Sequence, residues 1–92
     1  GLLTGNDVNR SLAEQFGLPI FEELSLKLPK EIYRKVSYAF AKKNLIIPLR
    51  EENDAILVAI SDPLNLEPIE ELRLLLERKI KPVYSDKETI DI

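Results

Sequence analysis

Two apolar runs separated by a polar turn form the clearest pattern in the chain. Leu45–Arg50 and Ala55–Ile60 are rich in aliphatic residues, and Glu51-Glu52-Asn53-Asp54 lies between them. This arrangement predicts two strands joined as a β-hairpin. The second run is apolar at every position, which predicts a central strand covered on both faces. Pro48 has no N–H to donate to a ladder, so we expect the first strand at an edge of the sheet.

A first helix is predicted upstream of the hairpin, where Val8, Leu12 and Phe16 recur every four residues and form one apolar stripe. Thr4, with an acid three residues later, is suited to its N-terminus. Gly17 is suited to its end, because glycine readily adopts the left-handed conformation that terminates helices.

An extended connector is predicted at residues 18–28, with Ile20, Phe21 and Leu24 placed against the core. A second helix is then predicted as one uninterrupted segment from Pro29 to Asn44, because proline is tolerated in a first helical turn. Its predicted core stripe consists of Ile32, Val36, Ala39 and Phe40.

A third helix is predicted after the hairpin, with Asn65 as its N-cap and Leu74 off its buried face. The predicted buried stripe consists of Ile69, Leu72, Leu75 and Leu76. Ile80–Tyr84 then predicts a third strand, and the helical crossover makes it parallel to the second. Ser85 and Asp86 are suited to cap a final helical turn.

These elements predict an α+β fold in which N-terminal helices pack on a small three-stranded sheet, made of a β-hairpin and a βαβ crossover. The chain has 92 residues, which is enough for one domain with a modest core. We therefore expect residues 1–92 to form a single docking or regulatory domain, with a helical lead-in at 1–17 and an α/β core at 18–92.

The composition removes several kinds of chemistry. The chain contains no cysteine and no histidine, so disulfides, thiolate metal sites and the commonest general base are excluded. No phosphate-binding Gly-x-x-x-x-Gly-Lys-Ser/Thr motif is present. The acidic pairs Asp54 with Asp62 and Glu70 with Glu71 do not predict a catalytic or Mg²⁺ site, because their side chains are expected to diverge. We predict no catalytic residue, no metal and no cofactor.

Charge is divided unevenly along the chain. Residues 27–50 carry a net charge of +6 and residues 51–77 a net charge of −7, within a total of −3. The predicted second helix presents a candidate partner-binding surface of Arg34, Lys35, Tyr38, Lys42 and Lys43. Such residues can bind nucleic acid or acidic lipid, or can form a solvated face. The isoelectric point near 5.0 disfavours nucleic acid, so among functional interpretations we favour a protein partner with an acidic patch.

The order of several short segments resembles the N-terminal domain of the ATPases that power type II secretion and type IV pilus assembly. The resemblance runs from residue 12 to the end and rests on Leu12-Ala13 with Phe16-Gly17-Leu18-Pro19, Ile47-Pro48-Leu49, Leu57-Val58-Ala59 with Asp62-Pro63, and Ile69 with Glu71-Leu72. It implies a bacterial, non-catalytic docking and regulatory module of a hexameric ATPase. It also implies a cytoplasmic location, with peripheral association at the inner membrane through the cytoplasmic domain of an inner-membrane secretion protein, without direct membrane insertion.

Two alternatives remain open. Gly1, Leu2, Leu3, Val8, Leu12 and Gln15 resemble the latter half of a cyclic di-GMP-binding motif found in some members of that family. The motif's leading Arg-Leu-Gly segment is missing from residues 1–92, and residues 16–40 contain no second copy, so we expect a truncated nucleotide site. The same module could also be fused to another bacterial membrane enzyme, such as a glycosyltransferase.

Overall fold

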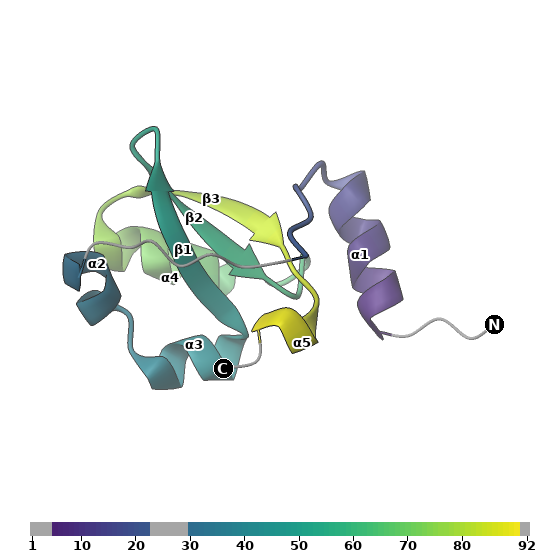
Figure 1. Cartoon of the computed structure of the whole chain (residues 1–92), viewed down its shortest axis with the longest axis horizontal. Helices are drawn as coiled ribbons and strands as arrows, with labels where there is room; N and C mark the ends of the chain where they lie inside the picture. The colour runs from purple at the N-terminus through teal and green to yellow at the C-terminus, as the bar shows by residue number, and fades with distance from the viewer. Residues whose placement is uncertain (1–4, 23–29, 91–92) are drawn as a thin grey trace.

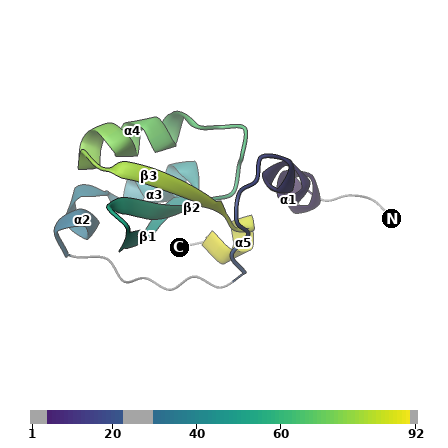
Figure 2. The same cartoon turned by 90° about the horizontal axis from the view of Figure 1, so that it is seen from above.

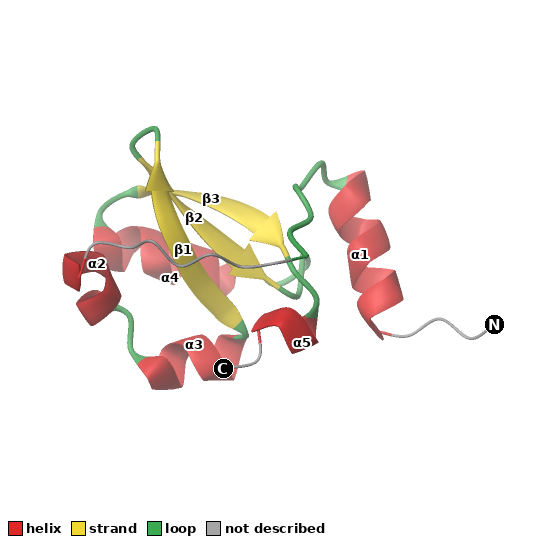
Figure 3. Ribbon diagram, viewed as in Figure 1, coloured by secondary structure: helices red, strands yellow, loops and turns green. Residues whose placement is uncertain are grey.

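The fold is a three-stranded mixed sheet with helices on both faces, seen in a computed structural model that describes residues 5–22 and 30–90 (Figures 1 and 3). The elements are α1 (Gly5–Gln15), α2 (Lys30–Lys35), α3 (Tyr38–Asn44), β1 (Ile46–Glu52), β2 (Ala55–Ile60), α4 (Glu67–Leu76), β3 (Lys79–Tyr84) and α5 (Lys87–Ile90). β1 pairs with β2 antiparallel, and β2 pairs with β3 parallel across the α4 crossover. The predicted α+β class is confirmed.

The hairpin turn is shorter than predicted. Asn53 and Asp54 alone form the loop, both with positive φ, and Glu52 pairs with Ala55. This is the geometry of a two-residue hairpin turn, and asparagine and aspartate tolerate it better than most residues. Edge strand β1 contains Pro48, as predicted, and its pairing register shifts between Pro48 and Arg50.

The central strand β2 separates two apolar clusters. Val58 points into the larger cluster with residues of α2, β1 and α4, and is fully buried. Leu57 and Ala59 point into the other cluster, which includes Ile90 of α5 and is flanked by Phe21. Figure 2 shows α4 and α5 on opposite sides of the sheet. The prediction that β2 is covered on both faces is confirmed.

The connector contributes to the sheet edge beside β3. Ile20 forms a parallel bridge with Tyr84, and the N–H of Phe21 donates to the Tyr84 carbonyl at 2.8 Å. Buried Ser85 donates its hydroxyl to the Phe21 carbonyl at 2.8 Å. These bonds hold the connector against the core as predicted, while Leu24 lies outside the described residues.

The predicted second helix is two helices. Ser37 interrupts it with extended backbone angles (φ −73°, ψ 148°), and its hydroxyl accepts a hydrogen bond from the N–H of Phe40 at 3.1 Å. Serine favours this capping role over a helix interior, because its side chain then satisfies an otherwise unpaired N–H. The break also changes the stripe: Ala41 is buried and Ala39 is exposed, which corrects the prediction for Ala39.

α4 differs from its prediction at both ends. The residue before its first turn is Leu66, and no side chain caps the helix there, so Asn65 is not the N-cap. Asp62 instead organises the approach by accepting a hydrogen bond from the N–H of Leu64 at 3.0 Å. Leu75 is 50% exposed, which corrects its assignment to the core, whereas Leu74 is off the buried face as predicted.

Helix α1 lies at one end of the molecule, beyond the tip of β3 (Figures 1 and 2). Ala13 of α1 is fully buried, while Val8 is 46% exposed and Phe16, directly after the helix, is 53% exposed. The predicted apolar stripe is therefore not a buried face, because α1 meets the body around Ala13 rather than along that stripe. Gly17 ends the helix with a φ of 73°, as predicted.

Candidate partner-binding surface

The five cationic and aromatic residues singled out in the sequence occupy two helices rather than one. Arg34 and Lys35 lie in the last turn of α2, whereas Tyr38, Lys42 and Lys43 lie on α3 beyond the break at Ser37. The prediction that one helix from Pro29 to Asn44 presents all five residues is therefore wrong. Two local preferences compete at Ser37: the apolar periodicity favours a continuous helix, and serine favours a helix cap. The cap prevails.

All five side chains are exposed, and two of them are in contact. The ammonium of Lys42 lies 5.7 Å from the centre of the Tyr38 ring, within the range of a cation–π interaction. Lys42 and Lys43 also lie in the last turn of α3, where cations interact favourably with the helix dipole. We call these five residues, two on α2 and three on α3, the basic α2–α3 surface.

The residues of the alternative nucleotide motif are only partly described. Gly1, Leu2 and Leu3 lie outside the described residues. On α1, Val8 and Gln15 are exposed and Leu12 is half-buried. These α1 side chains are therefore largely not packed in the core.

A network that sequence reasoning missed links α1 to the body. Arg10 donates to Asp86 Oδ2 at 2.7 Å, and the Tyr84 hydroxyl donates to Asp86 Oδ1 at 3.0 Å. Glu22 lies 3.9 Å from the Arg10 guanidinium. The hydrogen bond from Arg10 to Asp86 raises the pKa of the guanidinium above its ordinary value. No sequence periodicity connects residues so far apart, so only the fold brings them together.

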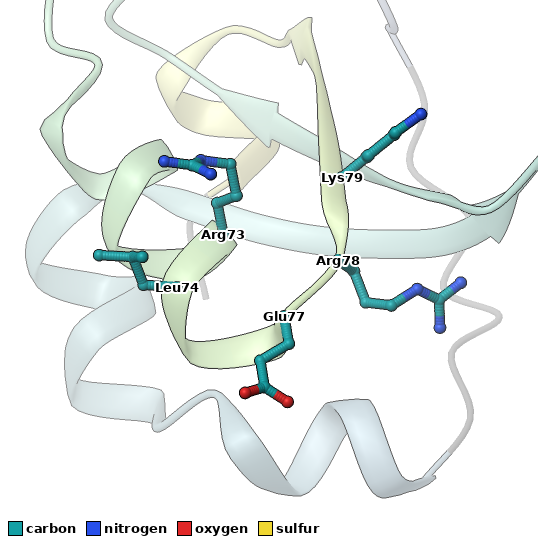
Figure 4. A pocket seen from close by; sticks show the side chains of 5 residues that line it. All are labelled: Arg73, Leu74, Glu77, Arg78 and Lys79. Carbon is teal, nitrogen blue, oxygen red and sulfur yellow. The ribbon is translucent and has the colours of Figure 1, made fainter.

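An open pocket of about 430 Å³ lies where α4 joins β3 (Figure 4). It is lined by Arg73, Leu74, Glu77, Arg78 and Lys79. Carboxylates already compensate two of its three cations: Arg73 pairs with Glu70 at 2.7 Å and Arg78 with Glu51 at 2.8 Å. Because of these ion pairs, the pocket lacks the strong net positive charge that a phosphate site requires.

The acidic residues considered in the sequence do not converge on one site. Asp54 and Asp62 flank opposite ends of β2, and Glu70 and Glu71 are both exposed on α4. Within residues 5–22 and 30–90, no group of three or more acidic residues is placed to hold a metal ion. In the same ranges, no helix has the length and apolar character needed to cross a membrane.

The model of one protein family, the MshEN domain, matches residues 16–92. Among curated proteins, the type IV pilus assembly ATPase PilB of Myxococcus xanthus (strain DK1622) is 23% identical over 90 residues. That match covers 98% of this chain but 16% of PilB, so the chain spans a small part of the relative's length.

Two solved structures share the fold over nearly the whole chain. The N-terminal domain of XpsE superimposes with a TM-score of 0.83 at 23% identity, covering 99% of this chain and 64% of the other. MshE, solved with cdg (cyclic di-GMP), gives a TM-score of 0.74 at 19% identity, covering 96% of this chain and 64% of the other.

Proposed function

This chain belongs to the MshEN domain family, and from that premise we propose that it is a docking and regulatory module of a bacterial secretion or pilus-assembly ATPase. It is an MshEN domain and not a catalytic ATPase domain. Residues 1–92 contain no phosphate loop, so ATP hydrolysis would belong to another part of the parent protein. The relationship to PilB, a pilus-assembly ATPase, supports this assignment.

The observation that carries the proposal is an exposed cationic surface on a well-packed core. The basic α2–α3 surface presents four positive charges and the ring of Tyr38, while Ile32 and Ala41 of the same helices are buried. A domain of this kind can bind a partner without rearranging, because the binding residues and the packing residues are separate. The mechanism we assign is rigid-body transmission, in which motor movements reach the partner through an undeformed module.

The partner we propose is the cytoplasmic domain of an inner-membrane secretion protein, presenting an acidic patch to Arg34, Lys35, Tyr38, Lys42 and Lys43. The parent protein would be a hexamer in the cytoplasm, held peripherally at the inner membrane through this contact. Opposite charges across such an interface mainly accelerate association and select the partner.

The proposal is tested by calorimetry between residues 1–92 and the partner's cytoplasmic domain from the same secretion system. We expect saturable binding that weakens as salt is raised. Absence of binding by a chain shown to be folded by circular dichroism would reject docking by this module.

A second candidate function is cyclic di-GMP sensing, which the exposure of Val8 and Gln15 on α1 favours, together with the solved complex of the similar protein MshE. For residues 1–92 alone we expect no measurable binding, because an arginine to stack on guanine and pair with phosphate is absent from the motif segment. Titration with cyclic di-GMP tests this directly. A low-micromolar dissociation constant would place sensing ahead of docking.

A further inference from the structure

The outer face of α4 is a second surface with the opposite character. Glu67, Glu71 and Leu75 are spaced four residues apart, as are Glu70 and Leu74, so the five side chains form two adjacent rows. All five are exposed, and Leu74 is 70% exposed. Arg73 compensates Glu70. We call these five residues the acidic α4 surface: an apolar pair beside carboxylates.

The basic α2–α3 surface complements the acidic α4 surface in both charge and apolar content. It offers Arg34, Lys35, Lys42 and Lys43 against the glutamates, and the 57% exposed ring of Tyr38 against the leucines. Neighbouring exposed apolar side chains rimmed by charged groups are characteristic of protein interaction sites. Another copy of this chain carries the complementary pattern, because each copy has both surfaces.

The helices that carry the two surfaces occupy different parts of the molecule, and α2 is in contact with α4. α4 covers one face of the sheet, whereas α3 lies along the bottom of the view and α2 at the end away from α1 (Figures 1 and 2). We propose that copies of this chain associate head to tail, with the acidic α4 surface of one copy against the basic α2–α3 surface of the next. Such contacts between unlike surfaces generate rings or open filaments rather than two-fold dimers.

The contact is expected to be weak between free chains. α4 has 10 residues and is therefore about 15 Å long, and specific stable interfaces usually bury more than about 1,000 Å² in total. Tethering changes this, because copies held side by side experience effective concentrations in the millimolar range. That step rests on the proposed function, in which the parent protein is a hexamer. The head-to-tail contact itself does not.

The contact also has a regulatory consequence. The basic α2–α3 surface would serve both the neighbouring copy and the membrane partner, so the two contacts exclude each other on any one copy. Binding of the membrane partner then dissociates the contact between copies, and the contact forms again when the partner is released.

Sedimentation velocity of residues 1–92, up to about 1 mM, tests the inference. We expect concentration-dependent association near 0.01 M salt, where the Debye length is about 30 Å, and its loss near 1 M, where that length is about 3 Å. A chain that stays monomeric throughout this concentration range at low salt would overturn the proposal.

Two charge-reversed variants locate the contact. Glu67→Lys with Glu71→Lys makes the acidic α4 surface basic, and Lys42→Glu with Lys43→Glu cancels the net positive charge of the basic α2–α3 surface. Each variant alone should associate at least tenfold more weakly than wild type, and an equimolar mixture should recover association. Retention of wild-type association by either variant alone would place the contact elsewhere and overturn the assignment.

Controls separate surface effects from net charge and from folding. Glu14→Lys changes the net charge in the same direction away from α4 and should keep wild-type association. If the α4 lysine variant fails to fold by circular dichroism, Glu67→Gln with Glu71→Gln removes the charges more gently and should still weaken association. The α4 variants should bind the membrane partner at least as well as wild type. Failure of the copy contact is thus distinguishable from failure of docking.

Discussion

The guanidinium of Arg10 in α1 lies 2.7 Å from the carboxylate of Asp86, 76 residues later in the chain. The same carboxylate accepts a hydrogen bond from Tyr84 at the end of β3. Both charged side chains are partly exposed, so the ion pair orients α1 more than it raises the free energy of unfolding of the whole domain. It joins the outlying helix α1 to the end of the sheet.

Replacing Arg10 with alanine should loosen α1 without unfolding the core. Hydrogen exchange should show faster exchange for α1 amides, while amides of β2 keep their protection, because local opening and global unfolding are separate events. Arg73→Ala is the matched control, since it breaks an ion pair confined to α4. Unchanged α1 protection in the Arg10 variant would show that the ion pair does not hold the helix.

Ser37→Ala distinguishes the observed pair of helices from a single continuous helix. In the observed fold, the substitution removes the hydroxyl that caps α3 and should cost about 1 kcal/mol in the free energy of unfolding. In a continuous helix, alanine would be neutral or stabilising, because it has the higher helix propensity. Chemical denaturation measures the sign, and a stabilised variant would contradict the break at Ser37.

The parts of the fold that sequence could predict depend on local signals. The apolar run at β2, the edge position implied by Pro48 and the glycine end of α1 each have a local physical cause, and each is confirmed. The sequence could not decide between two local preferences at Ser37, where capping prevailed over helical spacing. It also could not identify Leu75 as exposed, because helical spacing alone does not say how wide the buried face is.

The candidate site was less predictable than the fold. Exposed lysines and arginines give no sequence signal of the helix on which they lie. The basic residues could therefore be identified from the sequence, but their division between α2 and α3 could not. The Arg10–Asp86 pair depends on how the fold brings distant segments together, and no pattern within either segment predicts it. Their roles in binding remain proposals.

Val58→Asp should abolish the fold. Val58 is fully buried in the larger cluster, and an unpaired charge there costs several kcal/mol, a large share of the stability of a small domain. Circular dichroism melts provide the measurement, with Leu74→Asp as a control at an exposed position. A cooperative transition within a few degrees of wild type would show that Val58 tolerates a charge.

The Glu51–Arg78 ion pair should make stability depend on acidic pH. The hydrogen bond from Arg78 lowers the pKa of Glu51 in the folded state. A lowered folded pKa means that the contribution is fully present above the unfolded value of about 4.3 and is lost as pH falls through the folded pKa.

The difference in melting temperature between wild type and Glu51→Gln should therefore be largest near neutral pH and shrink below about pH 4. Glu71→Gln, for an exposed glutamate of α4, provides the comparison. A difference that stays constant across this range would show that the ion pair does not contribute through ionisation.

The docking role is tested most directly by reversing the basic α2–α3 surface and measuring association with the membrane partner's cytoplasmic domain. Arg34→Glu, Lys35→Glu and Lys42→Glu together leave the buried residues Ile32 and Ala41 unchanged, and surface substitutions usually cost within about 0.5 kcal/mol each. Lys79→Glu, Lys81→Glu and Lys87→Glu make the same change in net charge elsewhere. We predict that the first variant associates more slowly and loses its salt dependence, while the control binds like wild type. Undiminished binding by the first variant at low salt would contradict docking through this surface.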